Sequence, residues 1–387
     1  MNSVFFSSEM SSCNTLDDLI KTAEMSVEDA LTMPPSVYTS EDFHQLELEK
    51  LFRKEWVCVG RVEEIPKFGD FVTLDIAGQP VVAIRQKDNE IRAFANTCLH
   101  RCSKLLDDKR GNRPRINCPY HAWTYDMSGK LLAAPYMTET KDFTIEGKRL
   151  HELRVEVWEG FIYVTLDPSV ESVSAQLAGL QEVYGQYRMA DYITFVHDDE
   201  IWDGNWKILV ENFIEGYHLF KIHKTSFEPI SPTSWQFPQK GGDAYMYATA
   251  KVKPESGFCV APETNTHLEG EWRETGSVGC VFPSHLIQIT GDFLWYMSIQ
   301  PEGTGKLRVR RGLSVAPERL AMVDESDRES FFAEMKALFD QVNTEDKVAV
   351  NAVSAGVQSQ FAKQSQMSIH EGCLKDFSRY LAKKLAK

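Results

Sequence analysis

Two short pairs of metal-binding side chains constrain the N-terminal half of this chain more than any other feature. Cys98 and His100 form the first pair, Cys118 and His121 form the second, and seventeen residues separate His100 from Cys118. Thiolate sulfur and imidazole nitrogen are ligands for zinc and for iron–sulfur centres. We therefore expect two loops, each supplying one Cys and one His, that bind metal together.

The mixed composition of the pairs favours an iron–sulfur cluster over zinc. In a Rieske [2Fe-2S] centre two Cys bind one iron and two His bind the other, which suits transfer of one electron at moderate potential. A structural zinc site uses the same residue types, but it usually groups Cys with Cys and His with His. Mixed pairs are what two irons with different ligands require if each loop reaches both metals.

A second group of candidate ligands lies about a hundred residues later. His218 and His223 are five residues apart, so on a regular helix their side chains diverge by about 140°. They can face one metal only if the helix ends, kinks or bulges between them. Two His and one carboxylate form the ligand set of non-haem Fe(II) oxygenases. Glu215 and Asp346 are both candidates for the carboxylate.

Composition indicates an enzyme of ordinary globular type. The 387 residues suggest two or three domains, and 43% apolar with 25% charged residues is typical of globular proteins. The sequence has no apolar run long enough to span a bilayer and no secretory signal at its start, so we expect a cytoplasmic location. A net charge of −14 argues against nucleic acid or an anionic membrane as a partner.

The pattern of elements changes twice along the chain. We expect a helical segment in residues 1–50, a β-rich domain in residues 51–166 and a mixed domain in residues 167–387. Helices are predicted over residues 40–52, 175–184, 206–219, 325–361 and 373–386, whereas residues 1–37 show no strong period. Antiparallel strands followed by long helices predict an α+β fold.

Three segments resemble the Rieske non-haem iron oxygenase alpha subunits, the aromatic-ring-hydroxylating oxygenase family. Residues 96–101 and 118–123 are similar to the two cluster loops, and residues 345–350 are similar to a downstream iron-ligand segment. The resemblance covers about residues 38–361 and is weak over 225–285. It implies an N-terminal Rieske β-sandwich and a C-terminal helix-grip catalytic domain with an antiparallel sheet. Cys102 departs from the family, which usually has Gly at this position.

The same resemblance implies roles for individual residues. Asp346, at the start of a late helix, is the third ligand of the mononuclear Fe(II), and Glu215 bridges to a Rieske His of a neighbouring subunit. Asn212 and Tyr217 are further candidates for catalysis. Most family members have Asp at the position of Glu215, whereas those acting on quaternary ammonium substrates tend to have Glu.

The implied partner is a separate reductase. The sequence has no Gly-rich dinucleotide fingerprint and no third cluster of Cys, so a flavin and iron–sulfur reductase would use NAD(P)H and supply electrons for O2. The family also implies a head-to-tail homotrimer. Residues 99–117 carry six basic and two acidic side chains, a net charge of +4. This basic loop is either a docking surface for the reductase or simply a solvated loop.

Three functions compete at this stage. The first is a monooxygenase that hydroxylates a quaternary ammonium or betaine compound and thereby demethylates or cleaves it. The second is a ring-hydroxylating or O-demethylating oxygenase of an aromatic acid, which would need a cation such as Lys221, Lys224 or Arg273 in the pocket. The third is a Rieske electron carrier without catalysis. Aromatic side chains favour the first; the candidates for the pocket are Trp202, Phe213, Tyr217, Trp235, Phe293, Trp295 and Tyr296.

Overall fold

The computed structural model describes residues 3–386 and the side chains of residues 14–386. Met1, Asn2 and Lys387 lie outside the described residues. The chain divides into two compact units, of which one is Phe52–Val173. The other contains the preceding residues up to Leu51 together with those from Ser174 onward. None of the helices in the described part of the chain combines the length and apolarity needed to cross a membrane.

The unit Phe52–Val173 consists of two antiparallel sheets. Apolar side chains from both sheets, including Phe71, Phe94 and Tyr125, form its core, so the predicted β-sandwich is confirmed. The larger sheet has the order β1 (Val57–Arg61), β10 (Phe161–Thr165), β9 (Glu152–Trp158), β4 (Ile91–Ala95), β3 (Gln79–Arg85), β2 (Asp70–Ile76) and β5 (Arg110–Asn112). The smaller sheet has the order β6 (Ile116–Asn117), β7 (Thr124–Tyr125) and β8 (Leu131–Ala133).

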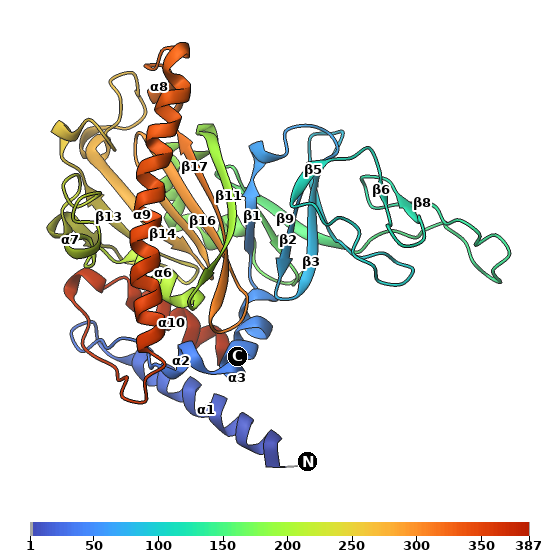
Figure 1. Cartoon of the computed structure of the whole chain (residues 1–387), viewed down its shortest axis with the longest axis horizontal. Helices are drawn as coiled ribbons and strands as arrows, with labels where there is room; N and C mark the ends of the chain where they lie inside the picture. The colour runs from blue at the N-terminus through green and yellow to red at the C-terminus, as the bar shows by residue number, and fades with distance from the viewer. Residues whose placement is uncertain (1–2, 387) are drawn as a thin grey trace. The chain divides into compact units, whose positions relative to one another are not determined.

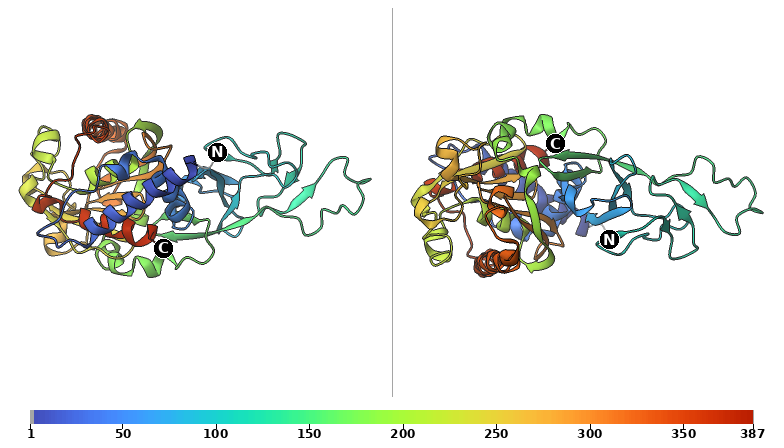
Figure 2. Two further views of the ribbon diagram at one scale, coloured as in Figure 1. Left: turned by 90° about the horizontal axis from the view of Figure 1, so that it is seen from below. Right: turned by 90° about the horizontal axis from the view of Figure 1, so that it is seen from above.

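The other unit is built on one seven-stranded antiparallel sheet, as predicted. The long helix α9 (Arg328–Gly356) crosses one face of this sheet, and both panels of Figure 2 look nearly along its axis. The ring of Phe339 on α9 contacts the rings of Phe293 and Trp295 on the sheet, which is the helix-grip arrangement. The strand order is β11 (Ile193–Asp203), β17 (Lys306–Val315), β16 (Phe293–Pro301), β15 (His285–Ile289), β14 (Thr275–Val281), β13 (Tyr245–Lys251) and β12 (Gln236–Pro238).

Shorter helices surround this sheet (Figure 1). They are α2 (Ser36–Thr39), α3 (Glu41–Glu47), α4 (Val173–Gln176), α5 (Ala178–Tyr184), α6 (Trp206–Ile214), α7 (Leu219–Ile222), α8 (Pro317–Leu320) and α10 (Leu374–Leu385). The predicted helix over residues 40–52 is α3, which Ser40 caps by accepting from the backbone N–H of Phe43, followed by a π-helical turn over Leu48–Phe52. The helix expected over residues 175–184 is interrupted at Leu177.

Residues 1–37 show no strong period in the sequence, yet α1 spans Ser3–Glu24 within the predicted helical segment. Part of its support comes from the opposite end of the chain. The backbone carbonyl of Thr22 accepts a 2.7 Å hydrogen bond from Nζ of Lys375 on α10. A helix stabilised by such distant contacts needs no strong period of its own.

A buried ion pair connects α3 to α6. Nζ of Lys207 lies 2.6 Å from a carboxylate oxygen of Glu47, and both side chains are almost completely buried. The other oxygen of Glu47 accepts from the indole N–H of Trp206 at 3.0 Å. Burial lowers the pKa of Lys207, and Glu47 opposes this effect. The pair therefore depends on both partners being present.

We predict that Lys207→Met lowers the free energy of unfolding by about 3 to 5 kcal/mol, because it leaves the Glu47 carboxylate buried without a cation. Chemical denaturation followed by circular dichroism measures this loss. Lys383→Met is the matched control, since Lys383 pairs with Asp243 on the surface, and we expect a loss below about 1 kcal/mol. Equal losses for the two variants would contradict the assigned role of the buried pair.

Candidate metal centres and substrate cavity

The two cluster loops have the same backbone conformation. The N–H of Cys98 donates to the carbonyl of Ser103 at 2.9 Å, and the N–H of Cys118 donates to the carbonyl of Trp123 at 2.8 Å. In each loop the residue four positions after the Cys has a positive φ, 55° at Cys102 and 56° at Ala122. This conformation explains why the family favours Gly at the position of Cys102, and it shows that Cys can adopt it.

Side chains of the two loops converge as a [2Fe-2S] cluster requires. The rings of His100 and His121 are 4.6 Å apart between centroids, and His100 also stacks on Trp123 at 4.9 Å. Nδ1 of His100 is buried without a hydrogen-bond partner, as expected of a nitrogen atom that binds a metal. The four predicted residues Cys98, His100, Cys118 and His121 therefore fit this group.

Thiolate character is supported at Cys118. Although burial opposes ionisation, hydrogen bonds from the backbone N–H groups of Tyr120 and His121 lower the pKa of the Cys118 thiol. Burial raises the pKa of Cys98, whose sulfur lies 3.3 Å from the hydroxyl of Tyr125. Hydrogen bonds to sulfur are one of the means by which proteins set the potential of such clusters.

Three of the six basic side chains in the basic loop are paired with carboxylates. Lys104 pairs with Asp107, Arg110 with Glu64 and Arg113 with Asp108. Arg101 lies instead over the ring of Tyr120, with its guanidinium carbon 5.8 Å from the ring centroid. The exposed surface beside the cluster residues consequently combines Arg101 with the apolar side chains of Leu99 and Tyr120.

The second candidate site forms where the chain leaves α6. The predicted helix over residues 206–219 ends earlier, at Ile214, because Glu215 has an extended backbone conformation. The Glu215 carboxylate then accepts hydrogen bonds from the backbone N–H groups of Tyr217 and His218. The single turn α7 lies between His218 and His223, so the two imidazoles can converge although they are five residues apart.

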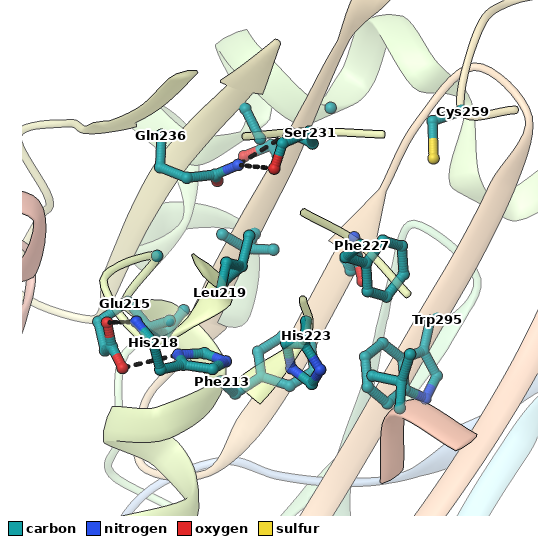
Figure 3. Close-up of a pocket in the computed structure, with 18 of the residues that line it drawn as sticks. Phe213, Glu215, His218, Leu219, His223, Phe227, Ser231, Gln236, Cys259 and Trp295 are labelled. Carbon is teal, nitrogen blue, oxygen red and sulfur yellow. Dashed lines mark hydrogen bonds and ion pairs between the residues drawn. The ribbon is translucent and has the colours of Figure 1, made fainter. Parts of the chain in front are cut away.

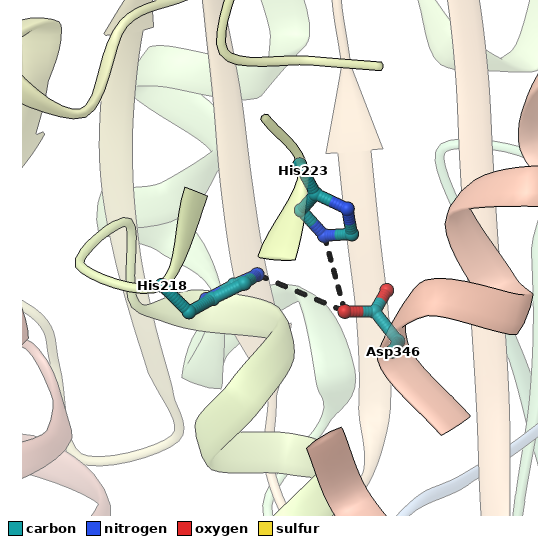
Figure 4. Close-up of side chains that lie close together, drawn as sticks. All are labelled: His218, His223 and Asp346. Carbon is teal, nitrogen blue, oxygen red and sulfur yellow. Dashed lines mark ion pairs between the residues drawn. The ribbon is translucent and has the colours of Figure 1, made fainter. Parts of the chain in front are cut away.

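Asp346 completes this group. Oδ1 of Asp346 lies 3.7 Å from Nε2 of His218 and 3.1 Å from Nε2 of His223 (Figure 4). One ligand atom from each of the three residues lies within 4.8 Å of the other two. Asp346 lies well inside α9 and not at the start of a helix, so that detail of the prediction was wrong.

A carboxylate holds each imidazole from its far side. Nδ1 of His218 lies 2.7 Å from Glu215, and Nδ1 of His223 lies 2.8 Å from Glu345. These contacts leave both Nε2 atoms directed at Asp346, which is the orientation that a metal requires. The role of Glu345 was missed from the sequence, and its position next to Asp346 was the available signal.

Electrostatics in this group favour a cation. Burial lowers the pKa of His223, but Asp346 and Glu345 outweigh it and raise the pKa of the imidazole overall. Iron(II) at Nε2 would satisfy the same demand for positive charge. The residues His218, His223 and Asp346 thus fit a mononuclear iron, with Glu215 and Glu345 as supporting groups.

A cavity opens from these ligands into the interior of the unit (Figure 3). Phe213, Phe227 and Trp295 line it, as do His218, His223 and Asp346. Figure 3 places Ser231, Gln236 and Cys259 at the end away from His218. Its other lining residues are Asn212, Ile214, Glu215, Gly216, Leu219, Ala250, Val252, Gly276, Ser277, Val278, Gln288, Thr290 and Val342.

The predicted pocket aromatics divide into two groups. Phe213 and Trp295 line the cavity, and Phe227 does so without having been predicted. The others are absent from its lining: Trp202, Tyr217, Trp235, Phe293 and Tyr296. Tyr217 is 47% exposed, whereas Asn212 contributes a buried, unpartnered amide oxygen. Of these two further candidates for catalysis, Asn212 lines the cavity and Tyr217 does not.

None of the described lining residues is Lys or Arg. Lys221 and Lys224 lie outside the cavity wall. The guanidinium of Arg273 donates to the backbone carbonyls of the loop that contains Ala261 and Asn265. None of the three cations that the sequence could not place therefore lines the cavity.

Each candidate site falls within a segment that matches a family model. Residues 183–387 match the family model for the ring hydroxylating alpha subunit (catalytic domain), and residues 55–144 match that for the Rieske [2Fe-2S] domain. The carnitine monooxygenase oxygenase subunit of Escherichia coli is 30% identical over 252 residues, 63% of this chain and 66% of that protein. The glycine betaine monooxygenase oxygenase subunit of Pseudomonas aeruginosa is 33% identical over 205 residues, 52% and 47% of the two chains.

The chain thus spans slightly less than two thirds of the carnitine monooxygenase subunit and about half of the glycine betaine monooxygenase subunit. A crystal structure of the quaternary ammonium Rieske monooxygenase CntA is similar in fold along nearly its whole length. Its TM-score is 0.79 at 23% identity, covering 94% of this chain and 98% of that one.

We predict that His218→Ala, His223→Ala and Asp346→Ala each remove the mononuclear iron and keep the electron paramagnetic resonance signal of the reduced cluster, because the two ligand sets lie in separate units. Cys98→Ala should instead abolish the signal of the cluster and keep the mononuclear iron. Glu345→Gln should weaken iron binding by about 10- to 100-fold, as supporting groups of metal ligands usually do. Iron analysis that finds metal retained in Asp346→Ala but lost in Glu215→Ala would reverse the ligand assignment.

Proposed function

The chain belongs to the ring-hydroxylating oxygenase alpha-subunit family, and we propose that it is the oxygenase component of a Rieske monooxygenase for a quaternary ammonium compound. When bound, the cluster supplies single electrons and the mononuclear iron activates O2. The alternative of an electron carrier without catalysis leaves the group of His218, His223 and Asp346, and the cavity beside it, without a purpose.

The observation that carries this proposal is the character of the cavity wall beside the ligands. The rings of Phe213 and Trp295 are 5.1 Å apart between centroids, and Phe227 lies close to His223, with 6.2 Å between ring centroids. A trimethylammonium group offers no N–H donor, so aromatic faces recognise it by cation–π attraction. Glu215 and Asp346 provide the only carboxylates of the described wall, both at the ligand end.

Residues of this chain position the metal ligands and the substrate, and they exclude water from the cavity. Glu215 and Glu345 hold the two imidazoles, and the apolar wall holds the substrate with a C–H bond toward the ligand end. One oxygen atom of O2 enters that C–H bond, and the other leaves as water with two protons and two electrons. Hydroxylation of an N-methyl group yields a carbinol, which loses its hydroxyl proton as the C–N bond breaks and so gives formaldehyde and a tertiary amine.

Electrons come from a separate reductase. Its docking surface is the exposed patch formed by Leu99, Arg101 and Tyr120 beside the cluster ligands. This patch replaces the wider basic loop as the candidate surface, because Lys104, Arg110 and Arg113 are already paired with carboxylates.

Besides the reductase, the cluster domain also contacts a neighbouring copy of this chain in a head-to-tail trimer. A cavity of about 470 Å³ lies behind His218 and is lined by the carboxylates of Glu211, Glu215 and Glu371. Burial raises the pKa of Glu211 to about 7 and also raises that of Glu371. A cationic side chain from a neighbouring copy would relieve this crowding of carboxylates. Glu215 would then connect His218 to the cluster ligand of that copy.

We predict that O2 consumption by this protein, supplied with reductase and NAD(P)H, is stimulated by quaternary ammonium compounds and coupled to an aldehyde product. Choline, carnitine and glycine betaine form the test panel, and benzoate is the comparison because no described cation lines the cavity to bind its carboxylate. Coupled turnover of benzoate, with no response to any quaternary amine, would assign the chain to the aromatic-acid alternative.

We predict that Glu215→Gln retains both metals but lowers turnover by at least about tenfold, because the amide cannot hold His218 as the carboxylate does. Trimers that mix Cys98→Ala with His218→Ala subunits test the path of the electron. Activity in the mixed trimers, with none in either parent, is expected for transfer between subunits. Inactive mixed trimers would contradict the proposed bridge.

A further inference from the structure

A row of side chains crosses the sheet beneath the substrate cavity. Gln288 on β15 is the direct partner of Val278 on β14 and of Trp295 on β16. Directly paired residues of antiparallel strands point to the same face, with Cβ atoms about 5 Å apart. All three residues line the cavity. The register of the sheet therefore makes the side chains of Gln288 and Trp295 neighbours on the cavity face.

Both of these polar groups lack a partner within the described chain. Nε1 of Trp295 is buried and has no hydrogen-bond acceptor, and Trp295 is only 3% exposed. The side chain of Gln288 makes no hydrogen bond to any described residue, although the remaining residues of β15 are buried. An unpaired donor in such a place costs free energy, and a bound molecule can remove that cost.

The polar group at the other end of the cavity is different. The amide nitrogen of Gln236 already donates to the hydroxyl of Ser231 at 2.8 Å, and that hydroxyl donates to the carbonyl of Lys251. Gln236 is thus partly satisfied by the protein itself. The indole N–H of Trp295 and the amide of Gln288 have no such partner and remain available to a ligand.

Charge decides what this subsite can bind. No Lys or Arg is among the described residues of the cavity wall, so a carboxylate at the subsite would have no cationic side chain as partner. Burying a charge without a partner is costly. A hydroxyl group matches better, since it accepts from the indole N–H of Trp295 and donates to the amide oxygen of Gln288.

We propose that Gln288 and Trp295 form a specificity subsite for an uncharged hydroxyl oxygen, and that the substrate is a quaternary amino alcohol rather than a betaine with a carboxylate. This inference rests on the proposed function and narrows its substrate class. The aromatic rings hold the ammonium group, and the subsite fixes the other end of the molecule.

The test compares choline, glycine betaine and the oxygen-free ethyltrimethylammonium ion. In the wild-type protein we expect kcat/KM for choline to exceed the values for the other two at least about tenfold. Trp295→Phe keeps the ring and removes the N–H, and Gln288→Leu removes the amide. Each should lower the ratio of kcat/KM for choline to kcat/KM for ethyltrimethylammonium about tenfold, the effect of one lost hydrogen bond to a neutral group.

Two further variants sharpen the comparison. Gln236→Leu is the matched control, since it removes an amide from the other end of the cavity and should leave the ratio of choline to ethyltrimethylammonium unchanged. Gln288→Lys supplies the missing cation and should raise kcat/KM for glycine betaine relative to choline. Titration calorimetry with choline checks that folded variants lose binding in the same order as they lose kcat/KM.

Equal losses for choline and ethyltrimethylammonium in Trp295→Phe and Gln288→Leu would overturn the subsite. Preference of the wild-type protein for glycine betaine would also overturn it, while the proposed function would stand. If no quaternary ammonium compound binds or stimulates O2 uptake, the proposed function fails and the subsite fails with it.

Discussion

Two hydrogen bonds to imidazole Nδ1 atoms fix the geometry on which the catalytic unit depends. Glu215 holds His218 and Glu345 holds His223, so that both Nε2 atoms face Asp346. Glu215 also ends α6 by accepting from backbone N–H groups of the following turn. The same carboxylate therefore breaks the helix and orients a ligand, which links the local fold directly to the metal site.

His218 and Glu215 separate two cavities of the unit. Both residues, together with Asn212, line the substrate cavity and also the acidic cavity behind it. Substrate would enter from one side, and the electron-supplying copy would approach from the other. Such a partition would keep solvent and electron donor away from the reacting C–H bond and would keep the path to His218 short.

The sequence predicted the features that local spacing determines. Cys98, His100, Cys118 and His121 carry their chemistry in two short segments, and the requirement for a break near His218 followed from helix geometry alone. The sequence could not show where α6 ends, because the end of this helix depends on hydrogen bonds that the Glu215 side chain accepts from the backbone.

Features that depend on distant contacts were missed or left open. The helix α1 is supported by α10, and the role of Glu345 depends on how α9 faces His223. Gln288 and Trp295 become neighbours only through the register of β15 and β16. Arg273 was ambiguous for the same reason, since only the folded loop shows that backbone carbonyls occupy its guanidinium.

The central claim is that the two metal centres act together on one small substrate. A single-turnover measurement tests it most directly: the protein is chemically reduced, freed of excess reductant and exposed to O2 with and without choline. We predict that choline accelerates oxidation of the cluster and that about one product molecule forms per active site. Oxidation of the cluster at the same rate without substrate, and with no product, would contradict the account.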